Sequence, residues 1–284
     1  MFASAEPASA AGSRHTGSVS AQPTEEQLLA VALTAAHAAA AELASRFRAP
    51  AVDVRSKTTA TDPVSAADLA AEAAIRTVLA RARPDDAILG EEGGESSGVS
   101  GLRWVVDPLD GTVNYLYGIA TVAVSVACED ETGALVGVVL DPFGNDCFAA
   151  TRSGPARLND EVIDGSSCAS LDRALVATGF AYDAAVRREQ GAIVARLLPK
   201  VRDIRRAGSA ATDLASCAAG RFDAYFERGV QPWDIAAGAL ICARAGLAVR
   251  MLAELPAAAG RGALPPGIVV APTALIDELA ELVT

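Results

Sequence analysis

A short apolar run that ends in two acidic residues constrains the fold of this chain more than any other segment. Trp104-Val105-Val106 leads directly into Asp107 and Asp110, with Pro108 between the two aspartates and Gly111 after them. Because proline fixes φ and glycine tolerates conformations that other residues avoid, the pattern predicts a buried strand that delivers two carboxylates into a turn. An Asp-Pro-x-Asp-Gly segment alone is an ordinary turn, so its meaning depends on what accompanies it.

Two further acidic groups stand at the ends of predicted elements. Ile88-Leu89-Gly90 ends in Glu91, and Pro232-Trp233 places Asp234 in the first turn of a predicted helix. Either feature alone has a plain structural explanation: a solvated loop for Glu91, and a charge that favours the helix dipole for Asp234. Together, three acidic element ends in a chain of enzyme size favour a hard cation with oxygen ligands, and Mg²⁺ is the natural choice.

The composition narrows the class of chemistry. With 284 residues, 51% of them hydrophobic, the chain can bury a sizeable core as one large domain or two fused parts. A net charge of −11 argues against a nucleic acid or an anionic membrane as the main partner. The two histidines, His15 and His37, lie near the N-terminus, far from the acidic segments, which argues against a Ser-His-Asp hydrolase and His-ligated zinc. Hydrolytic chemistry here would run on carboxylates.

The cysteines and the N-terminus predict the compartment. Five widely spaced cysteines without a C-x-x-C pair read as reduced core residues of a cytoplasmic protein. The N-terminus has neither the basic start nor the apolar stretch of a signal peptide. No uninterrupted apolar run approaches 18 residues, so we expect a soluble protein with no membrane partner.

The pattern of elements predicts an α+β fold. We expect a disordered tail over residues 1–22 and a single domain over 23–284, with an α+β part at about 23–185 and an α/β part at about 186–284. Capping signatures predict helices that begin at Thr24, Ser65, Ser209 and Thr273, with Pro232 opening another and one more over 187–198. Strands are predicted at 87–89, 103–106, 121–128, 135–140, 146–151, 203–205, 223–226, 247–252 and 267–270.

The acidic segments resemble the signature motifs of the inositol monophosphatase family. The resemblance covers about residues 24 to 284. It is carried by these segments: Gly90-Glu91-Glu92, Asp107-Pro108-Leu109-Asp110-Gly111-Thr112, Trp233-Asp234-Ile235-Ala236-Ala237-Gly238, Gly208-Ser209-Ala210-Ala211, Tyr225-Phe226-Glu227, and the single residues Lys57, Asp62 and Asp68.

The resemblance implies a layered α/β/α/β/α sandwich of the inositol monophosphatase and fructose-1,6-bisphosphatase type. It also implies Mg²⁺-dependent hydrolysis of a phosphate monoester, with two or three Mg²⁺ ions per subunit. Carried over by motif, Glu91, Asp107 and the Leu109 carbonyl hold one cation. Asp107, Asp110 and Asp234 hold a second, and Glu91 supports a third through waters. A carboxylate shared by two cations brings them close enough to clamp the attacking and leaving oxygens.

The remaining site residues also follow from the resemblance. Thr112 would orient the attacking water with Asp68, and Glu91 and Asp110 complete the catalytic set. The amides of Gly111 and Thr112 would receive phosphate oxygens at a helix start. The substrate would further contact Asp110 and Asp234, and a wall that would hold ring hydroxyls comprises Gly208, Ser209, Ala210 and Glu227. A homodimer and inhibition by Li⁺ belong to the same expectation.

Two positions depart from the family pattern, and the substrate stays open. Val113 stands where the family usually has a second threonine, and Ala67 where a threonine often precedes the aspartate. Glu227 and the wall favour a polyol, so we expect inositol 1-phosphate. Fructose-1,6-bisphosphate, histidinol phosphate and a nucleotide phosphate are alternatives within the superfamily. A non-catalytic regulatory binding protein is the alternative from another class, and the intact acidic set argues against it.

Overall fold

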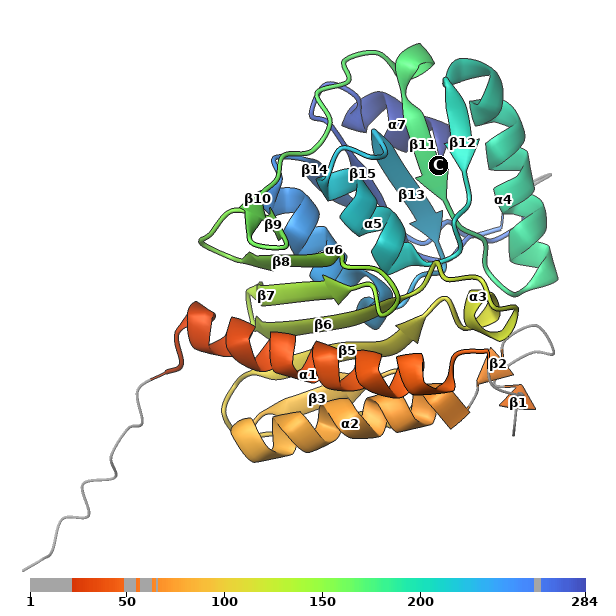
Figure 1. The fold of residues 1–284 in the computed structure, drawn as a ribbon. Coiled ribbons are helices and arrows are strands. Elements are labelled where there is room, and N and C mark those ends of the chain that lie inside the picture. The colour runs from red at the N-terminus through yellow and green to blue at the C-terminus, as the bar shows by residue number, and fades with distance from the viewer. Residues whose placement is uncertain (1–21, 49–54, 57–62, 65, 258–261) are drawn as a thin grey trace, which may run out of the picture.

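The computed structural model describes residues 22–48, 55–56, 63–64, 66–257 and 262–284, which form a layered molecule (Figure 1). Its layers are a helix pair, an eight-stranded sheet, a second helix pair, a five-stranded sheet and an outer helical layer. In Figure 1 the first helix pair lies in the lower part of the molecule and the five-stranded sheet in the upper part. This arrangement is the α/β/α/β/α sandwich expected from the sequence. The predicted tail up to residue 21, Lys57, Asp62 and the predicted cap Ser65 lie outside the described residues.

The helices begin close to their predicted starts. The α1 helix opens with the predicted capping box, in which Gln27 N donates to Thr24 Oγ1 and Thr24 N donates to Gln27 Oε1. The helices are α1 (Glu25–Arg46), α2 (Ala66–Ala82), α3 (Thr112–Leu116), α4 (Ala184–Leu197), α5 (Ala210–Ala218), α6 (Pro232–Arg244) and α7 (Ile276–Leu282), with 3₁₀ turns at Leu171–Arg173 and Leu198–Lys200.

The strands form two large sheets and one small pair. The pair is β1 (Arg55–Ser56) with β2 (Pro63–Val64). The eight-stranded sheet has the order β10-β9-β8-β7-β6-β5-β3-β4. Its strands are β3 (Ala87–Gly90), β4 (Gly94–Ser96), β5 (Arg103–Asp110), β6 (Ala123–Asp130), β7 (Gly133–Leu140), β8 (Cys147–Thr151), β9 (Arg157–Leu158) and β10 (Glu161–Val162). The five-stranded sheet, in the order β12-β11-β13-β15-β14, contains β11 (Leu175–Thr178), β12 (Asp203–Arg205), β13 (Ala224–Arg228), β14 (Ala248–Leu252) and β15 (Gly267–Ala271).

The outer helix α1 packs on α2 and on strands β6 and β7. The buried side chains of α1 include Leu28, Ala32, Ala36 and Leu43. The small alanines let the helix lie close to its neighbours. By length and composition, α1 is also the one helix among the described residues that could cross a membrane. Counting uninterrupted apolar runs missed this property, since a threonine and a histidine interrupt the alanines; the packing of α1 is that of a core helix.

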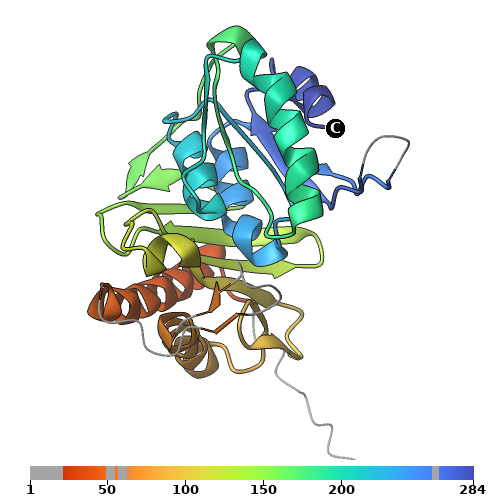
Figure 2. The ribbon, with the colours of Figure 1, turned by 90° about the vertical axis from the view of Figure 1, so that its right-hand side faces the viewer.

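The middle helices α5 and α6 join the two sheets, as the view in Figure 2 shows. One hydrophobic cluster contains Val105 and Ala127 from the first sheet, Leu214 and Ile241 from the helices, and Val270 from the second sheet. Both sheets therefore share one buried layer. The second sheet already includes β11, so the change from one sheet to the other falls between residues 162 and 175, earlier than the expected division near 185.

The predicted turn at Asp107–Gly111 is instead a continued strand. β5 runs to Asp110, and its pairing with β6 shifts where Asp107 faces Ser125 and Asp110 faces Ala123. Pro108 cannot donate to the ladder, and a bulge accommodates the extra residue. In a regular strand, residues three apart would face opposite sides; the bulge turns both aspartates to the same side. The chain reverses only at Gly111, whose φ of 97° suits glycine.

Thr273 is not the cap of the last helix, contrary to the prediction. Helix α7 begins at Ile276 after Leu275, without a side-chain cap. The carbonyl of Pro272 accepts hydrogen bonds from the amides of Leu275 and Ile276. A backbone carbonyl therefore satisfies amides at the helix start, in place of the expected threonine side chain. The predicted hairpin at 129–133 is present, with a shorter loop because the strands extend to Asp130 and from Gly133.

Candidate active site

The carboxylates meet at the carboxyl ends of two neighbouring strands. Strands β3 and β5 are parallel, and their register pairs Gly90 with Val106. The next residues along each strand are Glu91 and Asp107, which therefore lie side by side. The β5 bulge then brings Asp110 to the side that Asp107 faces.

Helix α6 brings the fourth carboxylate to the same place. Asp234 is the third residue of α6, and its Oδ2 accepts a hydrogen bond of 2.7 Å from the amide of Gln231. The buried Ser125, which pairs with Asp107, donates from its Oγ to the carbonyl of Trp233 at 3.0 Å. Ser125 of β6 thus holds the first turn of α6 close to Asp107 of β5.

These side chains line one cavity of about 570 Å³. Helix α3 and the segments before α5 and α6 close it on the other sides. The cavity is lined by Glu91, Asp107, Leu109, Asp110, Gly111, Thr112, Gly179, Phe180, Ala181, Tyr182, Asp183, Arg206, Gly208, Ser209, Ala210, Asp213, Glu227, Gly229, Val230, Gln231, Trp233 and Asp234. The structure therefore gathers in one place every described residue that the family resemblance assigned to metal or substrate contact.

Burial and neighbouring negative charges raise the pKa values of three of the carboxylates, Asp107, Asp110 and Asp234. Burial, followed by the charges of Glu91, Asp110 and Asp234, holds the pKa of Asp107 well above its usual range. Burial and the charge of Asp110 raise the pKa of Asp234 in the same way. Burial raises the pKa of Asp110 to about 6, although hydrogen bonds from Ser209 and Ala211 favour its charged form. When ionised, the cluster carries more negative charge than the nearby Arg206 offsets, so a cation is needed to stabilise its charged form.

That charge and the all-oxygen donor set fit a small divalent cation. Among the residues that the structure describes, no three His, Cys, Asp or Glu side chains already converge as a preformed metal site. Asp107 Oδ1 accepts from Leu109 N at 2.9 Å, and Asp110 Oδ2 accepts from Ser209 Oγ at 2.7 Å and Ala211 N at 2.6 Å. Because these oxygens are turned partly toward protein donors, cation binding would have to draw the carboxylates together.

A buried hydroxyl and carboxyl stand beside the cluster. Thr112 Oγ1 lies 2.9 Å from Asp68 Oδ1 and 3.2 Å from the Leu109 carbonyl. Asp68 is fully buried in the first turn of α2. A hydroxyl that donates its single hydrogen to a carboxylate keeps lone pairs that can accept a hydrogen bond from a water in the cavity.

The opposite wall is built around Glu227. Its Oε2 accepts a hydrogen bond of 2.7 Å from the buried Tyr225 hydroxyl, and burial raises its pKa to about 7. A Cβ added at Gly179 would stand 1.9 Å from Glu227 Oε2, so only glycine leaves room for this carboxyl group. Behind it, burial and the charge of Glu227 raise the pKa of Asp213 to about 8, and Asp213 Oδ1 is buried without a hydrogen-bond partner.

The sequence of the chain matches a known family over almost all of its length. The sequence model of the inositol monophosphatase family matches residues 24–283. The chain is 43% identical over 235 residues to the inositol-1-monophosphatase of Mycobacterium bovis, covering 80% of this chain and 79% of that protein. The chain belongs to the inositol monophosphatase family. The carboxylate cavity is the candidate active site of this family member.

Relatives in the family carry two kinds of name. The chain is 40% identical over 225 residues to the Nus factor SuhB of Escherichia coli, covering 77% of this chain and 83% of that protein. The solved structure of Mycobacterium tuberculosis SuhB superposes with a TM-score of 0.76 at 39% identity, covering 92% of this chain and 97% of that one. The layered fold is thus that of inositol monophosphatase family structures.

Several residues that shape the family site were not found from the sequence. Ser125 acts through a hydrogen bond to Trp233, 108 positions away, and no local pattern in the sequence indicates it. Arg206 lines the cavity, and its charge opposes the rise that burial causes in the pKa values of Asp110 and Glu227. Its place two residues before Gly208 was the available signal. The Ser209 hydroxyl caps α5 and donates to Asp110, so it is already engaged before any ring hydroxyl arrives.

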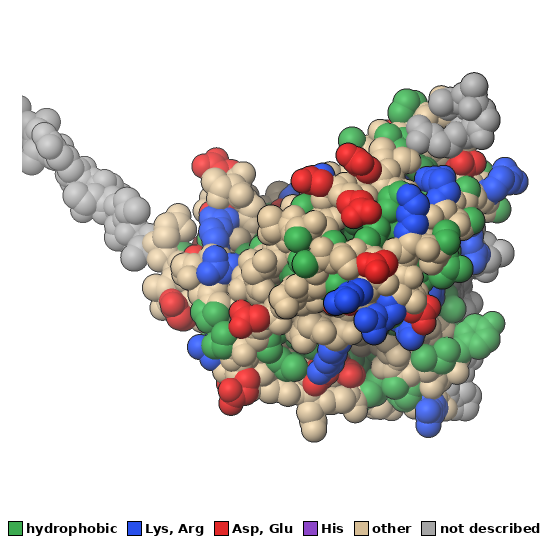
Figure 3. Space-filling model, turned by 90° about the horizontal axis from the view of Figure 1, so that it is seen from above, with side chains coloured by type: hydrophobic (Ala, Val, Ile, Leu, Met, Phe, Trp, Pro, Cys, Tyr) green, Lys and Arg blue, Asp and Glu red, His purple; other side chains and the backbone are tan. Residues whose placement is uncertain are grey.

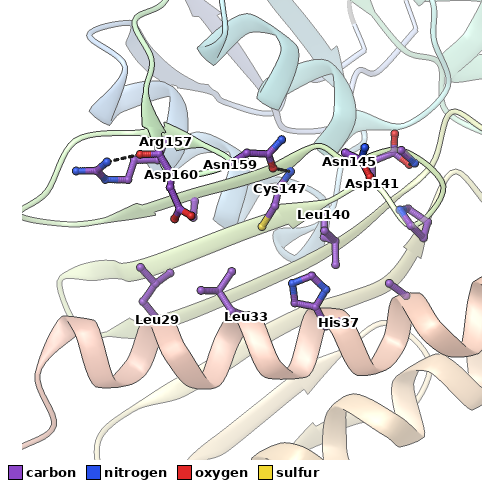
Figure 4. A pocket seen from close by; sticks show the side chains of 14 residues that line it. Leu29, Leu33, His37, Leu140, Asp141, Asn145, Cys147, Arg157, Asn159 and Asp160 are labelled. Carbon is purple, nitrogen blue, oxygen red and sulfur yellow. Dashed lines mark hydrogen bonds between the residues drawn. The ribbon is translucent and has the colours of Figure 1, made fainter.

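A second cavity, of about 530 Å³, lies away from the carboxylates, between α1 and the strands near β8 (Figure 4). Leu29, Leu33 and His37 of α1 point into it, toward Cys147. This places the one described histidine outside the carboxylate cavity. On the face seen from above in Figure 3, basic and acidic side chains of the described residues are interspersed.

The raised pKa values predict how the metal-free protein loses stability. The folded pKa values of Asp110, Glu227 and Asp213, about 6, 7 and 8, exceed the values of about 4 in an unfolded chain. The folded state then binds more protons at these three groups, so the stability that they contribute is full below about pH 4 and is lost as pH rises through about 6 to 8. We expect the melting temperature in EDTA to fall by roughly 5 °C or more between pH 5 and pH 9.

Mg²⁺ and one substitution provide the controls for this melting experiment. Saturating Mg²⁺ should restore most of the loss at pH 8, because a bound cation favours the charged carboxylates. Asp213→Asn should make the fall with pH shallower, since it removes a titrating group while keeping the shape of the side chain. A melting temperature in EDTA that is constant from pH 5 to pH 9 would contradict the assignment.

Proposed function

We propose that this chain is a Mg²⁺-dependent phosphatase that hydrolyses a polyol phosphate monoester, with inositol 1-phosphate as its substrate. The observation that carries the proposal is the set of four carboxylates, from β3, β5 and α6, that face one cavity opposite Glu227. Family membership supports hydrolysis of a phosphate ester, and the relatives named inositol-1-monophosphatase support this substrate.

Glu91, Asp107 and the Leu109 carbonyl would hold one Mg²⁺ ion, and Asp107, Asp110 and Asp234 a second, with Glu91 reaching a third through waters. When bound, these ions would supply the positive charge that lets an acidic protein accept a phosphate, and a lowered pKa for the attacking water. Li⁺, which is small but singly charged, would compete for such a position and inhibit. Val113 and Ala67 remove hydroxyls near the site but no proposed ligand.

Thr112 would position the attacking water. Its hydroxyl donates to Asp68, which is held in the buried first turn of α2, so the lone pairs of Thr112 Oγ1 face the cavity in a fixed direction. A water that donates to Thr112 is then oriented with its own lone pair toward the phosphorus. The amides of Gly111 and Thr112, at the start of α3, would receive phosphate oxygens.

Glu227 would select the polyol. Its carboxyl group is fixed by the Tyr225 hydroxyl and by the space at Gly179, so it can accept hydrogen bonds from ring hydroxyls without first being ordered. Gly208 and Ala210 would complete the wall beside it. Ser209 belongs to this wall through its backbone, because its hydroxyl is engaged with Asp110.

Replacing Glu227 tests this selection. Glu227→Gln is expected to lower kcat/KM for inositol 1-phosphate about 10- to 100-fold, because hydrogen bonds to a charged acceptor contribute about 1.5–3 kcal/mol. Activity on p-nitrophenyl phosphate, which has no ring hydroxyls, should change little. Tyr225→Phe, which frees the same carboxyl group without removing it, should act in the same direction but less. Equal losses on both substrates would place Glu227 outside the substrate contact.

A regulatory role is the second candidate, favoured by the relatives named Nus factor SuhB. A chain that only binds a partner has no need of Thr112, Asp68 and four carboxylates around one cavity.

We also propose a cytoplasmic homodimer. Tyr117 and Ile119, which are 81% and 50% exposed beside α3, offer an apolar surface that self-association would cover.

A substrate panel decides between these functions. We expect kcat/KM to be highest for inositol 1-phosphate and lower for fructose-1,6-bisphosphate, histidinol phosphate and nucleotide monophosphates, all in saturating Mg²⁺. A higher value for one of the others would change the substrate and keep the reaction. No phosphate release from any member of the panel would favour the regulatory role.

A further inference from the structure

Helix α2 carries a buried polar stripe that the catalytic proposal leaves unexplained. Asp68, Glu72 and Arg76 follow one another at intervals of four residues, so they lie on one face of the helix. Asp68 is 0% exposed and Glu72 is 3% exposed. The first of these residues contacts Thr112, and the second has no place in the chemistry described above.

Glu72 binds the turn that carries Glu91. Its Oε2 accepts from the amide of Glu92 at 2.7 Å, and its Oε1 accepts from the amide of Gly93 at 2.8 Å. Arg76 Nε donates to Glu72 Oε1 at 2.6 Å, and Arg76 Nη2 donates to the carbonyl of Gly94 at 2.7 Å. The buried carboxylate is thus paired with a cation and with two amides, which is what makes its burial tolerable.

The turn is shaped to admit this carboxylate. A Cβ added at Gly90 or at Gly93 would stand 2.6 Å from Glu72 Oε1. Neither glycine has a positive φ, so the requirement at both positions is space for the side chain of Glu72. Glycines therefore flank Glu91 and Glu92 where α2 reaches the backbone.

We propose that Glu72 is a positioning residue that holds Glu91 at a fixed place relative to Thr112. The inference rests on the proposed function, in which Glu91 binds Mg²⁺ and Thr112 orients the water. One turn of α2 separates Asp68 from Glu72, so a rigid helix sets the spacing between the hydroxyl and the ligand turn. Because Glu72 already orders the turn that carries Glu91, the Glu91 side chain loses less conformational freedom when Mg²⁺ binds. This preorganisation raises the affinity for Mg²⁺.

Glu72→Gln tests the proposal. The amide can accept from only one of the two turn N–H groups, and its own NH₂ faces the other. We expect calorimetry to show the dissociation constant for Mg²⁺ raised about 10-fold or more. Hydrogen exchange at the amides of Glu92 and Gly93 should become faster. The maximal rate should largely return at saturating Mg²⁺, because no reacting group has been removed.

Asp86→Asn is the matched control. Asp86 is 5% exposed, binds Arg83 and receives a 2.9 Å hydrogen bond from Trp104 Nε1, but it precedes β3 at the end of the sheet opposite Glu91. Each variant removes one buried carboxylate that is paired with an arginine: Glu72 with Arg76 in α2, and Asp86 with Arg83 directly after α2. Both variants should therefore lower the melting temperature. Only the Glu72 variant should weaken Mg²⁺ binding.

Arg76→Gln covers the case in which Glu72→Gln fails to fold. This substitution removes the cation paired with Glu72 and the hydrogen bond to Gly94, and it keeps the Glu72 carboxylate with its hydrogen bonds to the turn. A smaller rise in the Mg²⁺ dissociation constant is expected. Unchanged Mg²⁺ binding in the folded variants, with a parent that binds Mg²⁺, would overturn this inference alone; a parent that binds no Mg²⁺ would overturn the proposed function with it.

Discussion

Asp107→Asn is expected to lower turnover about a thousandfold and to weaken Mg²⁺ binding. Asp107 is 1% exposed, and its carboxyl group lies beside Glu91, Asp110 and Asp234, so in the proposed site it serves both cations. An amide keeps the shape but removes a charge and one anionic oxygen. Metal-based stabilisation of a transition state amounts to several kcal/mol, and each 1.36 kcal/mol is tenfold in rate, so roughly 4 kcal/mol corresponds to this loss.

Asp141→Asn provides a control of the same local structure. Asp107 and Asp141 are both followed by proline, and both accept a hydrogen bond from the amide two residues later, at 2.9 Å from Leu109 and 2.8 Å from Phe143. Asp141 lines the second cavity, away from the carboxylate cluster. Steady-state kinetics and Mg²⁺ calorimetry on both variants should show losses for Asp107→Asn only. Similar losses for both would attribute the effect to the shared aspartate–amide hydrogen bond rather than to cation binding.

Thr112→Ala is expected to lower kcat about a hundredfold while leaving Mg²⁺ binding nearly unchanged. The substitution removes the hydroxyl that donates to Asp68 and keeps every proposed metal ligand. Positioned proton acceptors and donors contribute typically 10²–10⁴-fold to rate. Because backbone amides would bind the phosphate in the proposed site, KM should change little.

Thr112→Ser is the matched variant, because it keeps the hydroxyl and removes only the methyl group. It should retain most of the turnover of the parent. Rapid-quench kinetics with excess enzyme would measure the chemical step directly. A Thr112→Ala protein that is as fast as the parent, or one that no longer binds Mg²⁺, would contradict the role proposed for the hydroxyl.

The sequence predicts the strands and helices that carry the site residues better than it predicts how these elements come together. The acidic ends of β3 and β5 and the start of α6 follow from local patterns: apolar runs, a proline at a helix start and capping residues. The bulge at Pro108 could not be predicted, because it depends on the register with β6, which the sequence of β5 alone does not contain. That register is what brings Asp107 and Asp110 to the same side.

Residues that act at long range were missed for the same reason. Ser125 contacts a residue 108 positions away, and Glu72 contacts amides 20 and 21 positions away. Each is an unremarkable polar residue in its own segment, and only the folded chain gives it a partner. Asp213 likewise reads as a helical acid, although it is buried and lines the cavity, where burial and the charge of Glu227 raise its pKa.

The central claim is that the carboxylate cavity hydrolyses a phosphate ester only with Mg²⁺ bound. The most direct test is phosphate release from inositol 1-phosphate by the metal-free protein as Mg²⁺ is added, with Asp107→Asn and Asp141→Asn measured in parallel. We predict no release without Mg²⁺, saturable release for the parent and for Asp141→Asn, and about a thousandfold less for Asp107→Asn. Release that is independent of Mg²⁺, or equal in the parent and Asp107→Asn, would contradict the claim.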